Sequence, residues 1–461
     1  MKLDKDTSHS AQSAQAIAAT AATSAATKVV SIGIVGAGPA GLMTALALEH
    51  HAPADRVSIT LLDQHASAAD YPGVEYGIQK RACMALEKIG KLDQALARSN
   101  PSVELGFYNA RLDKRFRSIK FDSHYTRSVA RQEFLADLDS LLARTKIHRR
   151  HKVTQISGAA NQSVIVRGEA GENKAPFDMQ FDLLVAADGI GSVARRSLWP
   201  AEATIHDRGF SCIYMLVEGT PDNAPPGFLA RANGGRSELI MGSCSTMTLF
   251  PLAKGRLAMG IGFDHATRQR LWAEHGLAPD TAWPEIAPNT KKAIAVQLTQ
   301  DARSQNDELV KALDLVPDWN SYKIYLWAMR DTDPLSQPYL RNANLIALGD
   351  AAHAMLPTIG MGASLAIEDG EALAACIAPL LAAAADADAF RTQVQTQVFE
   401  PFTRARFPVW TDLMQRARTA ATSNFIDVNR RKRFAIGPQI PNALASKVVT
   451  RLEWAADRLG I

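Results

Sequence analysis

Cysteine is scarce in this sequence: only 4 of the 461 residues are cysteine, and no two of them lie close together. A zinc site or a CxxC redox pair needs closely spaced ligands, so the spacing predicts no metal centre of this kind. Four scattered thiols suit a reducing compartment. We therefore expect a cytoplasmic protein that carries no metal.

An excess of charge of one sign and long apolar runs are also lacking. Lys plus Arg number 51 and Asp plus Glu number 47, which leaves a net charge of only +4. This balance gives no basic surface for nucleic acid. The longest apolar run near the C-terminus, 372–385, is far shorter than the ~20 residues that span a bilayer. We expect neither a nucleic-acid partner nor a transmembrane segment, and the oligomeric state stays open.

The sequence does contain short apolar runs that end in glycine or aspartate, and these predict buried strands of a parallel sheet. One covers 29–35, is followed by a helix, and leads to a second over 57–62, which completes a βαβ unit. Two more strands are expected at 183–187 and 345–348. Amphipathic helices are expected over 80–98 and 131–143, and helix again after about residue 365.

The middle of the chain follows a different pattern. Stretches 211–218, 256–263 and 322–330 alternate apolar and polar residues, and loops rich in proline and glycine separate them. Such alternation is typical of strands in an antiparallel sheet with one buried face. This region therefore predicts a separate β-rich unit inserted between two parts of the parallel-sheet domain.

Residues 36–41 form a GxGxxG motif between the first strand and the first helix. Gly36 permits a tight turn, Gly38 lets the backbone approach a pyrophosphate, and Gly41 lets the helix pack close to the strand. The helix begins at Pro39 and Ala40, where free N–H groups and the positive end of the helix dipole favour phosphate.

Asp63 ends the second strand, a position that suits the ribose hydroxyls of an adenosine, and Gln64 follows it. The glycine motif together with Asp63 predicts a bound dinucleotide. The pattern alone does not separate NAD from FAD.

Two further aspartates follow predicted strands. Asp350 lies where a carboxylate can accept hydrogen bonds from a polyol such as a ribityl chain. A loop with Gly360 and Gly362 then leads into a helix near Ala363, whose N–H groups could face a flavin's pyrimidine edge. Asp188 is followed by Gly189 and also marks a ligand contact, although the alternative for Asp188 is the N-cap of the next helix.

These motifs resemble, in order and spacing, the group A FAD-dependent aromatic monooxygenases of the para-hydroxybenzoate hydroxylase type. The segment 349–370, GDAAHAMLPTIGMGASLAIEDG, is similar to the family pattern GDAAHxxxPxxGxGxNxxxED. Arg131 resembles the arginine that supports FAD in the family. The sequence departs from the family at Ser364, where asparagine is common, at Met361, where glutamine is common, and at Glu75, where some members carry a phosphate-binding arginine.

The resemblance implies an α/β fold in which a split, Rossmann-type FAD-binding domain of the GR2 class carries an inserted antiparallel β-sheet. We expect a disordered tail (1–27), the FAD-binding domain (28–205 and 336–375), the β-rich substrate domain (206–335) and C-terminal helices (376–461). In the family the Asp188–Gly189 segment is associated with both FAD and NAD(P)H, so no separate nicotinamide domain is expected.

The family chemistry implies noncovalent FAD that is reduced by NAD(P)H and reacts with O2 to give a C4a-hydroperoxide, which hydroxylates a small aromatic molecule. No catalytic side chain is identified from the sequence. Candidate substrate contacts, each of which is also a normal core position, are Tyr214, Met241, Phe250, Trp327 and Pro357.

His353 is expected to be a histidine satisfied by hydrogen bonds rather than a catalytic base. The methionines of the inserted domain either form an irregular pocket for an apolar aromatic substrate or fill core, and the sequence leaves both open. Other open alternatives are a flavin-dependent epoxidase, a halogenase, an isoprenoid reductase, and a catalytically silent FAD-binding protein.

Overall fold

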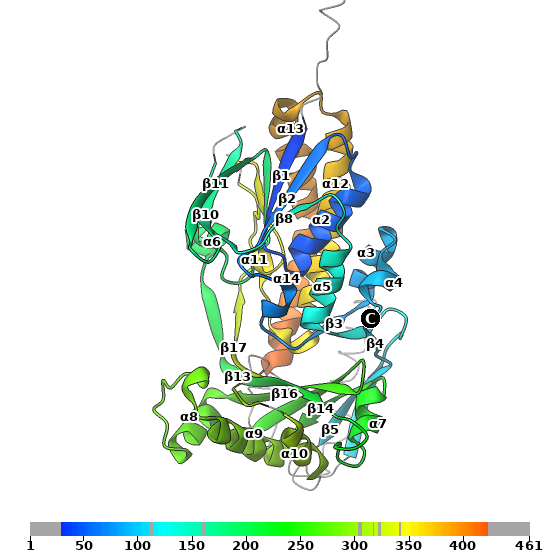
Figure 1. Cartoon of the computed structure of the whole chain (residues 1–461), viewed down its shortest axis with the longest axis vertical. Coiled ribbons are helices and arrows are strands. Elements are labelled where there is room, and N and C mark those ends of the chain that lie inside the picture. Colours follow the sequence, from blue (N-terminus) through cyan, green and yellow to red (C-terminus); the bar gives the residue numbers. More distant parts are fainter. Residues whose placement is uncertain are drawn as a thin grey trace, which may run out of the picture.

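The structure is a computed structural model that describes residues 29–422 except 110–113, 159–161, 303–306, 317, 321–323 and 341–342. The predicted tail 1–27 and the end of the predicted helical region, 423–461, lie outside the described residues. Figure 1 shows an upper part built around a parallel sheet and a lower part built around a larger sheet, with β13 (Ile205–Glu218) and β17 (Ile324–Thr332) reaching from one toward the other.

A five-stranded parallel sheet forms the centre of the upper part. Its strand order is β18-β12-β1-β2-β8, and every neighbouring pair is parallel. The carboxyl ends of all five strands therefore meet at one edge of the sheet, where ligands bind in folds of this class. The four predicted strands are confirmed, and the bounds are β1 (Val30–Val35), β2 (Val57–Leu62), β8 (Lys146–His148), β12 (Leu183–Ala186) and β18 (Leu345–Ala347).

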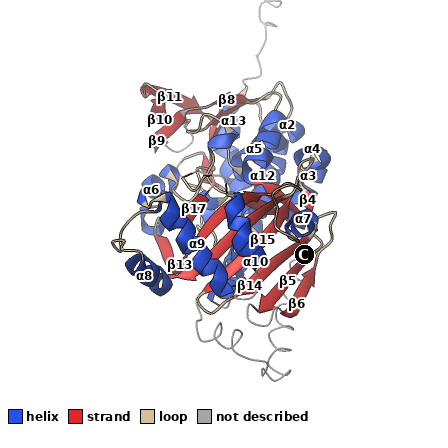
Figure 2. Cartoon of the chain, turned by 60° about the horizontal axis from the view of Figure 1, so that its bottom comes forward, coloured by secondary structure: helices blue, strands red, loops and turns tan. Residues whose placement is uncertain are grey.

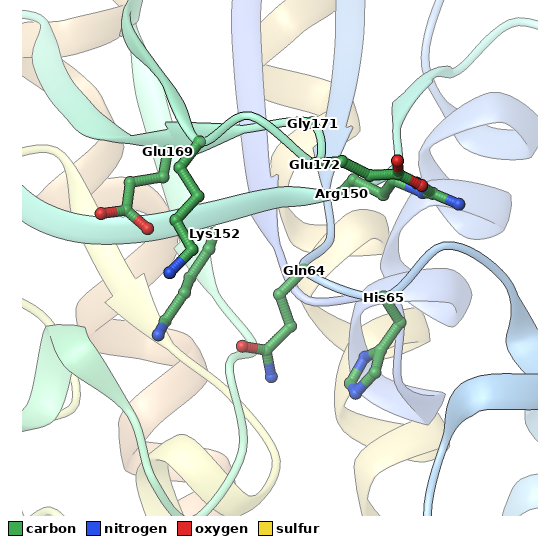
Figure 3. Close-up of a pocket in the computed structure, with 8 residues that line it drawn as sticks. Gln64, His65, Arg150, Lys152, Glu169, Gly171 and Glu172 are labelled. Atoms are coloured by element: carbon green, nitrogen blue, oxygen red, sulfur yellow. The ribbon is translucent and has the colours of Figure 1, made fainter.

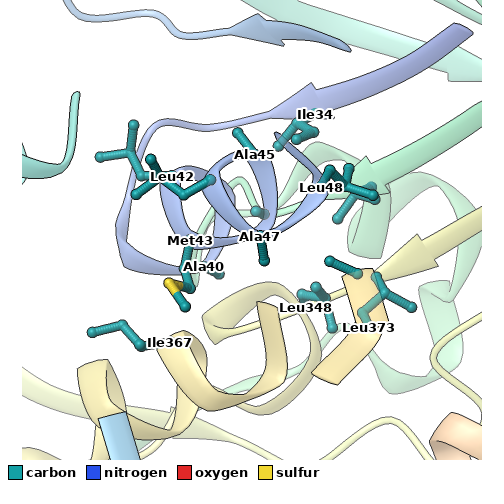
Figure 4. Close-up of a cluster of buried hydrophobic side chains, with 14 of the residues drawn as sticks. Ile34, Ala40, Leu42, Met43, Ala45, Ala47, Leu48, Leu348, Ile367 and Leu373 are labelled. Atoms are coloured by element: carbon teal, nitrogen blue, oxygen red, sulfur yellow. The ribbon is translucent and has the colours of Figure 1, made fainter. Parts of the chain in front are cut away.

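Two helices pack on this sheet and on each other, α2 (Pro39–His51) and α12 (Gly362–Ala383). Nine consecutive residues of α2 are buried, as expected for a helix that is apolar all round. The helices approach closely because a Cβ atom at Gly370 would lie 2.9 Å from the Thr44 nitrogen. Figure 4 shows the resulting core, in which Met43 of α2 and Ile367 of α12 lie side by side.

The lower part is a seven-stranded sheet that is antiparallel except for one parallel pair, β14 with β5. The predicted strands over 211–218, 256–263 and 322–330 are confirmed as β13, β16 and β17. The strand order is β17, β13, β16 (Arg256–Asp264), β15 (Ser245–Leu252), β14 (Arg236–Met241), β5 (Glu104–Asn109) and β6 (Lys114–Lys120).

Strands β5 and β6 come from the segment 28–205, which the sequence assigned entirely to the FAD-binding domain. Here the structure differs from the expectation. An edge strand such as β14 presents unpaired N–H and C=O groups, and the β5–β6 hairpin satisfies them. Pairing between segments so distant in sequence leaves no local pattern that could predict it.

The two faces of the seven-stranded sheet have different environments. Helices α8 (His265–Glu274), α9 (Pro288–Ala302) and α10 (Asp307–Ala312) cover one face, as Figure 2 shows. Met215, Met247 and Met259 are completely buried in the core on that side. Tyr214 and Phe250 alternate with them and therefore lie on the opposite face, toward the parallel-sheet domain.

The helix predicted over 80–98 is wrong in one respect, because the structure divides it into two. Helix α3 (Lys80–Lys88) ends before Gly90, whose positive φ of 65° suits glycine, and the Lys91 nitrogen donates to the Leu86 carbonyl. This is the usual glycine-terminated helix end. Helix α4 (Leu92–Ala95) follows. The helix predicted over 131–143 is confirmed as α5 (Arg131–Ser140).

Further helices and strands complete the fold. They are β3 (Glu75–Ile78), β4 (Asn100–Pro101), β7 (Arg127–Ala130), β9 (His151–Ser157), β10 (Val164–Ala170), β11 (Ala175–Phe181), α6 (Val193–Leu198), α7 (Phe228–Asn233), α11 (Asp350–His353), α13 (Ala387–Val394) and α14 (Glu400–Ala421). No helix in the described ranges has both the length and the apolar character needed to cross a membrane.

A buried charge network joins the C-terminal helices to the parallel-sheet domain. The Asp369 carboxylate of α12 accepts hydrogen bonds from His353 Nε2 (2.7 Å), Arg406 Nε (2.6 Å) and Trp410 Nε1 (2.9 Å). Burial alone would raise the pKa of Asp369, but Arg406 and the hydrogen bonds from His353 and Trp410 lower it below its ordinary value. His353 is satisfied by this contact, which confirms the expectation from the sequence.

We predict that Asp369→Asn destabilises the protein by about 1.5–3 kcal/mol, because it removes one of the two carboxylates that pair with the buried Arg406 guanidinium and leaves Glu368 as the remaining one. The midpoint of urea unfolding measures the change. Asp412→Asn, which removes an exposed carboxylate on α14, should cost less than about 0.5 kcal/mol. Because folding lowers the pKa of Asp369, its contribution is present at neutral pH and is lost in acid, as the pH falls below the unfolded value of about 4. Equal unfolding midpoints for wild type and Asp369→Asn would contradict this account.

Candidate active site

The glycine loop between β1 and α2 has the geometry that the motif predicts. Gly36 has a φ of +100°, and a Cβ atom on it would lie 2.3 Å from the Ala187 oxygen. A Cβ atom on Gly41 would lie 1.9 Å from the Gly36 oxygen. Helix α2 can therefore pack against the loop only if residue 41 has no side chain. At Gly38, by contrast, a Cβ atom would meet no atom within 4 Å. The open side at Gly38 and the N–H groups of the first helical turn fit a pyrophosphate.

Asp63 at the end of β2 is only 3% exposed, and its carboxylate is engaged within the chain. It accepts hydrogen bonds from the Ala37 nitrogen (2.7 Å), the His65 nitrogen (2.8 Å) and the Tyr71 hydroxyl. Burial would raise the pKa of Asp63, but these hydrogen bonds lower it. These contacts hold the end of β2 against the glycine loop. For Asp63 to accept a hydrogen bond from a ribose, Tyr71 or His65 must give up its bond to one of the Asp63 carboxylate oxygens.

An open pocket of about 450 Å³ lies next to Asp63. Figure 3 shows Gln64 and His65 on one side of it, opposite Lys152 and Glu169 of the β9–β10 hairpin. Gln64 is exposed, so its amide is available to a ligand. The pocket adjoins the end of β2, the strand that Asp63 terminates.

Asp188 uses one oxygen for structure and leaves the other without a partner. Its Oδ2 accepts from the Val193 nitrogen (2.7 Å) at the start of α6, while Oδ1 is buried and has no hydrogen-bond partner among the described residues. Desolvation raises the pKa of Asp188 despite these bonds. Gly189 has a φ of +76° and open space around it. Asp188 can therefore both cap the start of α6 with Oδ2 and contact a ligand with Oδ1.

Arg195 of α6 was given no role from the sequence, but the structure shows it to be a central support. The guanidinium is buried and donates to the carbonyls of Glu202 (2.7 Å), Asp333 (2.5 Å), Ala351 (3.3 Å) and Ala352 (3.0 Å). These bonds fix α11, and with it Asp350, against the segment after β12. A buried arginine surrounded by carbonyls could be predicted only from tertiary structure.

Asp350 begins α11 and is exposed, although the residues around it are buried. Desolvation in this hollow raises its pKa above the ordinary value, and the charges of His353 and Arg131 oppose the rise. Gly349, with a φ of +57°, brings the Asp350 strand end against the glycine loop, because a Cβ atom on it would lie 2.9 Å from the Ala40 Cβ. The glycine motif and the Asp350 segment therefore meet in space.

The loop between α11 and α12 is held in place by residues that sequence reasoning missed. Gln79 Nε2 donates to the carbonyls of Ile359 (3.1 Å) and Gly360 (3.0 Å), and the Gln79 nitrogen donates to Ser364 Oγ (2.9 Å). Gly360 has a φ of +63°, and α12 begins at Gly362, close to the predicted start near Ala363. Ser364, a departure from the family pattern, thus has a defined hydrogen-bonding role.

Arg131, the first residue of α5, lies between the two parts of the molecule. Its guanidinium carbon is 4.8 Å from the centre of the Tyr76 ring and 5.9 Å from that of Trp327. Its Nε is buried and has no hydrogen-bond partner in the described part of the chain. A buried guanidinium nitrogen without an acceptor is costly, so a ligand oxygen would stabilise it.

The structure groups most of the candidate substrate residues. Tyr214 and Phe250 belong to one cluster on the face toward Arg131, and Trp327, 42% exposed, lies beside Tyr325 on β17. Pro357 is exposed on the loop before Gly360. Met241 is 4% exposed and packs in a different cluster, with Phe107 and Leu239, so the structure does not bring it to the others.

The comparisons with known proteins agree with this geometry. The family model described as "FAD binding domain" matches residues 27–225 and 297–396. A salicylate hydroxylase of Pseudomonas putida is 26% identical over 359 residues, covering 74% of this chain and 75% of that protein. A 2-heptyl-3-hydroxy-4(1H)-quinolone synthase of Pseudomonas aeruginosa is 26% identical over 352 residues, covering 75% of this chain and 81% of that protein.

The fold is similar to that of Klebsiella pneumoniae HpxO, solved in complex with FAD and uric acid. The TM-score is 0.66 at 17% sequence identity, covering 88% of this chain and 91% of that chain. The family model covers more than half of the chain, and the open Gly38 cradle, the accessible Asp350 and the unpaired Arg131 nitrogen fit the cofactor. The chain therefore belongs to the FAD-binding domain family and is an FAD-dependent monooxygenase.

Proposed function

We propose that this enzyme uses NAD(P)H and O2 to hydroxylate an aromatic molecule in the space between the parallel-sheet domain and the seven-stranded sheet. One observation carries the proposal: the guanidinium carbon of Arg131, next to the motifs that fit FAD, lies 5.9 Å from the centre of the Trp327 ring on the facing sheet. A cofactor held at the sheet edge would thus face an aromatic surface. The proposal assigns 28–205 without β5 and β6, together with 336–375, to the FAD-binding domain. It assigns 206–335 together with β5 and β6 to the substrate domain, and 376–461 to the C-terminal helices.

Each part of FAD has candidate contacts along the sheet edge. The adenosine end would lie near Gln64, with Asp63 shaping the loop beside it. The pyrophosphate would lie at Gly38, with Arg131 as its cation, and the ribityl chain at Asp350. The flavin ring would lie at the start of α12. The full set comprises Gly36, Gly38, Pro39, Ala40, Gly41, Asp63, Gln64, Arg131, Asp188, Gly189, Asp350, Gly360, Gly362 and Ala363.

When bound and reduced by NAD(P)H, FAD supplies the activation of O2 and the transfer of one oxygen atom to the ring. The protein's own residues orient both partners and exclude water. Arg195 and Gln79 fix the loops that carry Asp350 and Gly360, and the aromatic face positions the substrate. The described cysteines are all free thiols, which supports the cytoplasm as the location.

Three methionines of the inserted domain pack in the core rather than in a substrate pocket. Met215, Met247 and Met259 are fully buried in the helix-covered core, so they do not line the site. Support for an apolar substrate comes instead from the aromatic side chains Tyr214, Phe250 and Trp327 on the other face. The relatives named for salicylate and for a quinolone, and the neighbour solved with uric acid, also favour an aromatic or heteroaromatic ring.

We predict that the purified protein releases FAD on acid precipitation and that an aromatic compound stimulates its oxidation of NAD(P)H. A panel of phenols, hydroxybenzoates and quinolones should yield a coupled product that carries one ¹⁸O atom when the reaction runs under ¹⁸O2. Mass spectrometry of the product and the ratio of product to NAD(P)H consumed measure the outcome. FAD binding with no stimulation by any ring would favour a silent FAD-binding protein.

We predict that Asp350→Ala weakens FAD binding by about 10- to 150-fold, the loss expected for one hydrogen bond to a charged group. Equilibrium dialysis of the apoprotein with FAD measures the dissociation constant. Asp178→Ala is the matched control, because it removes an exposed carboxylate of β11 and should leave FAD affinity unchanged. An Asp350→Ala variant with wild-type FAD affinity would show that this carboxylate does not contact the cofactor.

We predict that Trp327→Ala raises KM for the aromatic substrate by about 10-fold, because an aromatic contact of roughly 1–1.5 kcal/mol is lost. Because the side chain is 42% exposed, the unfolding midpoint should hardly change. Trp327→Phe should restore most of the affinity, as it keeps a ring. A large loss of stability with unchanged KM would instead assign Trp327 to folding.

A further inference from the structure

Glu75 occupies an unusual position between the cofactor loop and the aromatic face. It begins β3, which pairs with β7 so that Glu75 lies opposite Ala130. A Cβ atom at Gly77 would lie 3.7 Å from Glu75 Oε1 and also 3.7 Å from the Gly360 oxygen, so the carboxyl stands next to the loop before α12. The preceding residue, Val74, packs against the cluster that contains Tyr214.

Within the described part of the chain, the Glu75 carboxyl has no hydrogen bond or ion pair, and burial is the only influence on its pKa. The nearby cation, Arg131, instead stacks on the rings of Tyr76 and Trp327. The side chain is nonetheless only partly accessible. A desolvated carboxyl without a partner is unfavourable, so the position suits a ligand that supplies a hydrogen-bond donor.

The surroundings of Glu75 indicate what that ligand would be. Burial raises the pKa of Glu75 to about 7, and the negative charge of Glu75 contributes to raising the pKa of Tyr214 on β13. The rings of Tyr214, Phe250 and Tyr325 pack in the cluster that contains Val74, the residue before Glu75. An aromatic ligand with an O–H or N–H group would pack on these rings and donate a hydrogen bond to the carboxyl. An aromatic carboxylate would place a second negative charge beside it, which is unfavourable.

We propose that Glu75 is a substrate-binding acid–base residue whose carboxylate accepts the proton of a phenolic O–H or ring N–H, and so selects neutral aromatic donors over aromatic carboxylates. The inference rests on the proposed function and names the substrate class of the same site. In the step, the O–H bond breaks, the proton moves to Glu75, and the electron pair stays on the phenolic oxygen. The charge spreads into the ring, which becomes more reactive toward oxygen transfer.

The binding test uses the FAD-loaded protein and three probes of equal ring size: 2-naphthol, 2-methoxynaphthalene and 2-naphthoate. Perturbation of the flavin absorbance measures each dissociation constant without turnover. Wild type should bind 2-naphthol at least about 10-fold more tightly than the ether or the carboxylate, and Glu75→Gln should reduce this preference to about 3-fold or less. Glu218→Gln, which neutralises an exposed carboxylate on the same strand as Tyr214, should keep the wild-type preference.

A second readout is the pH dependence of kcat/KM for the phenol that the enzyme hydroxylates. The base must be ionised, so kcat/KM should rise as the pH increases through about 7 in wild type, and Glu75→Gln should lose this limb. The other titratable groups near Glu75 are Tyr214 with its neighbour Cys212 on β13, and, beside Tyr76, Arg131 on α5 and Asp350 on α11. If Glu75 had only a structural role, Glu75→Gln would leave the rise of kcat/KM with pH unchanged.

Several results would overturn the proposal. These are equal affinities of wild type for naphthol and its ether, no flavin perturbation by any probe, or an unchanged preference in Glu75→Gln. A Glu75→Gln variant that loses FAD affinity while keeping the naphthol preference would assign Glu75 to the cofactor instead. A clear binding preference combined with no hydroxylated product would count against the proposed function and leave the role of Glu75 in binding standing.

Discussion

Parallel pairing of β12 with β18 is the contact on which the site depends. Leu184 pairs with Leu345 and Ala186 with Ala347, so a segment far downstream joins the sheet in register with the first βαβ unit. Parallel strands place their carboxyl ends at one edge, and the ligand-facing residues therefore collect there. The close approach of Gly349 to Ala40 shows how tightly the two segments meet. A side chain at Gly349 would separate the Asp350 turn from the start of α2.

Simple alternation along the strands gives the seven-stranded sheet two different faces. Residues on one face bury methionines and leucines under α8, α9 and α10, while the next residue along each strand faces the parallel-sheet domain. Because side chains of a strand alternate in direction, a core and a ligand-facing surface can be built from the same strands. The residues that form the core and those of the proposed substrate surface are thus separated by face rather than by segment.

Buried polar groups in this molecule fall into two kinds. Asp369 and Arg195 have several partners each, and they tie α14 and α11 to the rest of the domain. Asp188 Oδ1, Arg131 Nε and the Glu75 carboxyl have none within the described residues. The first kind stabilises the fold, because every charge is satisfied. The second kind is unfavourable in the protein alone, and a ligand that supplied partners would stabilise it. Unpaired buried atoms also occur elsewhere among the described residues, for example at Trp283 Nε1 and Thr403 Oγ1, so such an atom supports a ligand contact only where it lies beside the cofactor motifs.

Local signals in the sequence determined much of this protein. Three patterns depend only on residues a few positions apart. They are the glycines at 36, 38 and 41, the apolar runs that end at Asp63 and Asp350, and the alternation of apolar and polar residues in the strands. These patterns were sufficient for the parallel sheet, the start of α2 at Pro39 and the FAD-binding family. They also predicted a satisfied His353, although its partner, Asp369, became visible only in the structure.

Tertiary structure alone decided the contacts between distant segments. No local sequence pattern predicts three of these contacts. They are the addition of β5 and β6 to the larger sheet, the hydrogen bond from Tyr71 to Asp63, and the position of Glu75 near Tyr214. The same holds for the methionines, whose side chains could face either a ligand or the core until the helices were placed over one face. Burial and hydrogen bonding depend on what packs against a residue, and that is a property of the whole fold rather than of the neighbouring sequence.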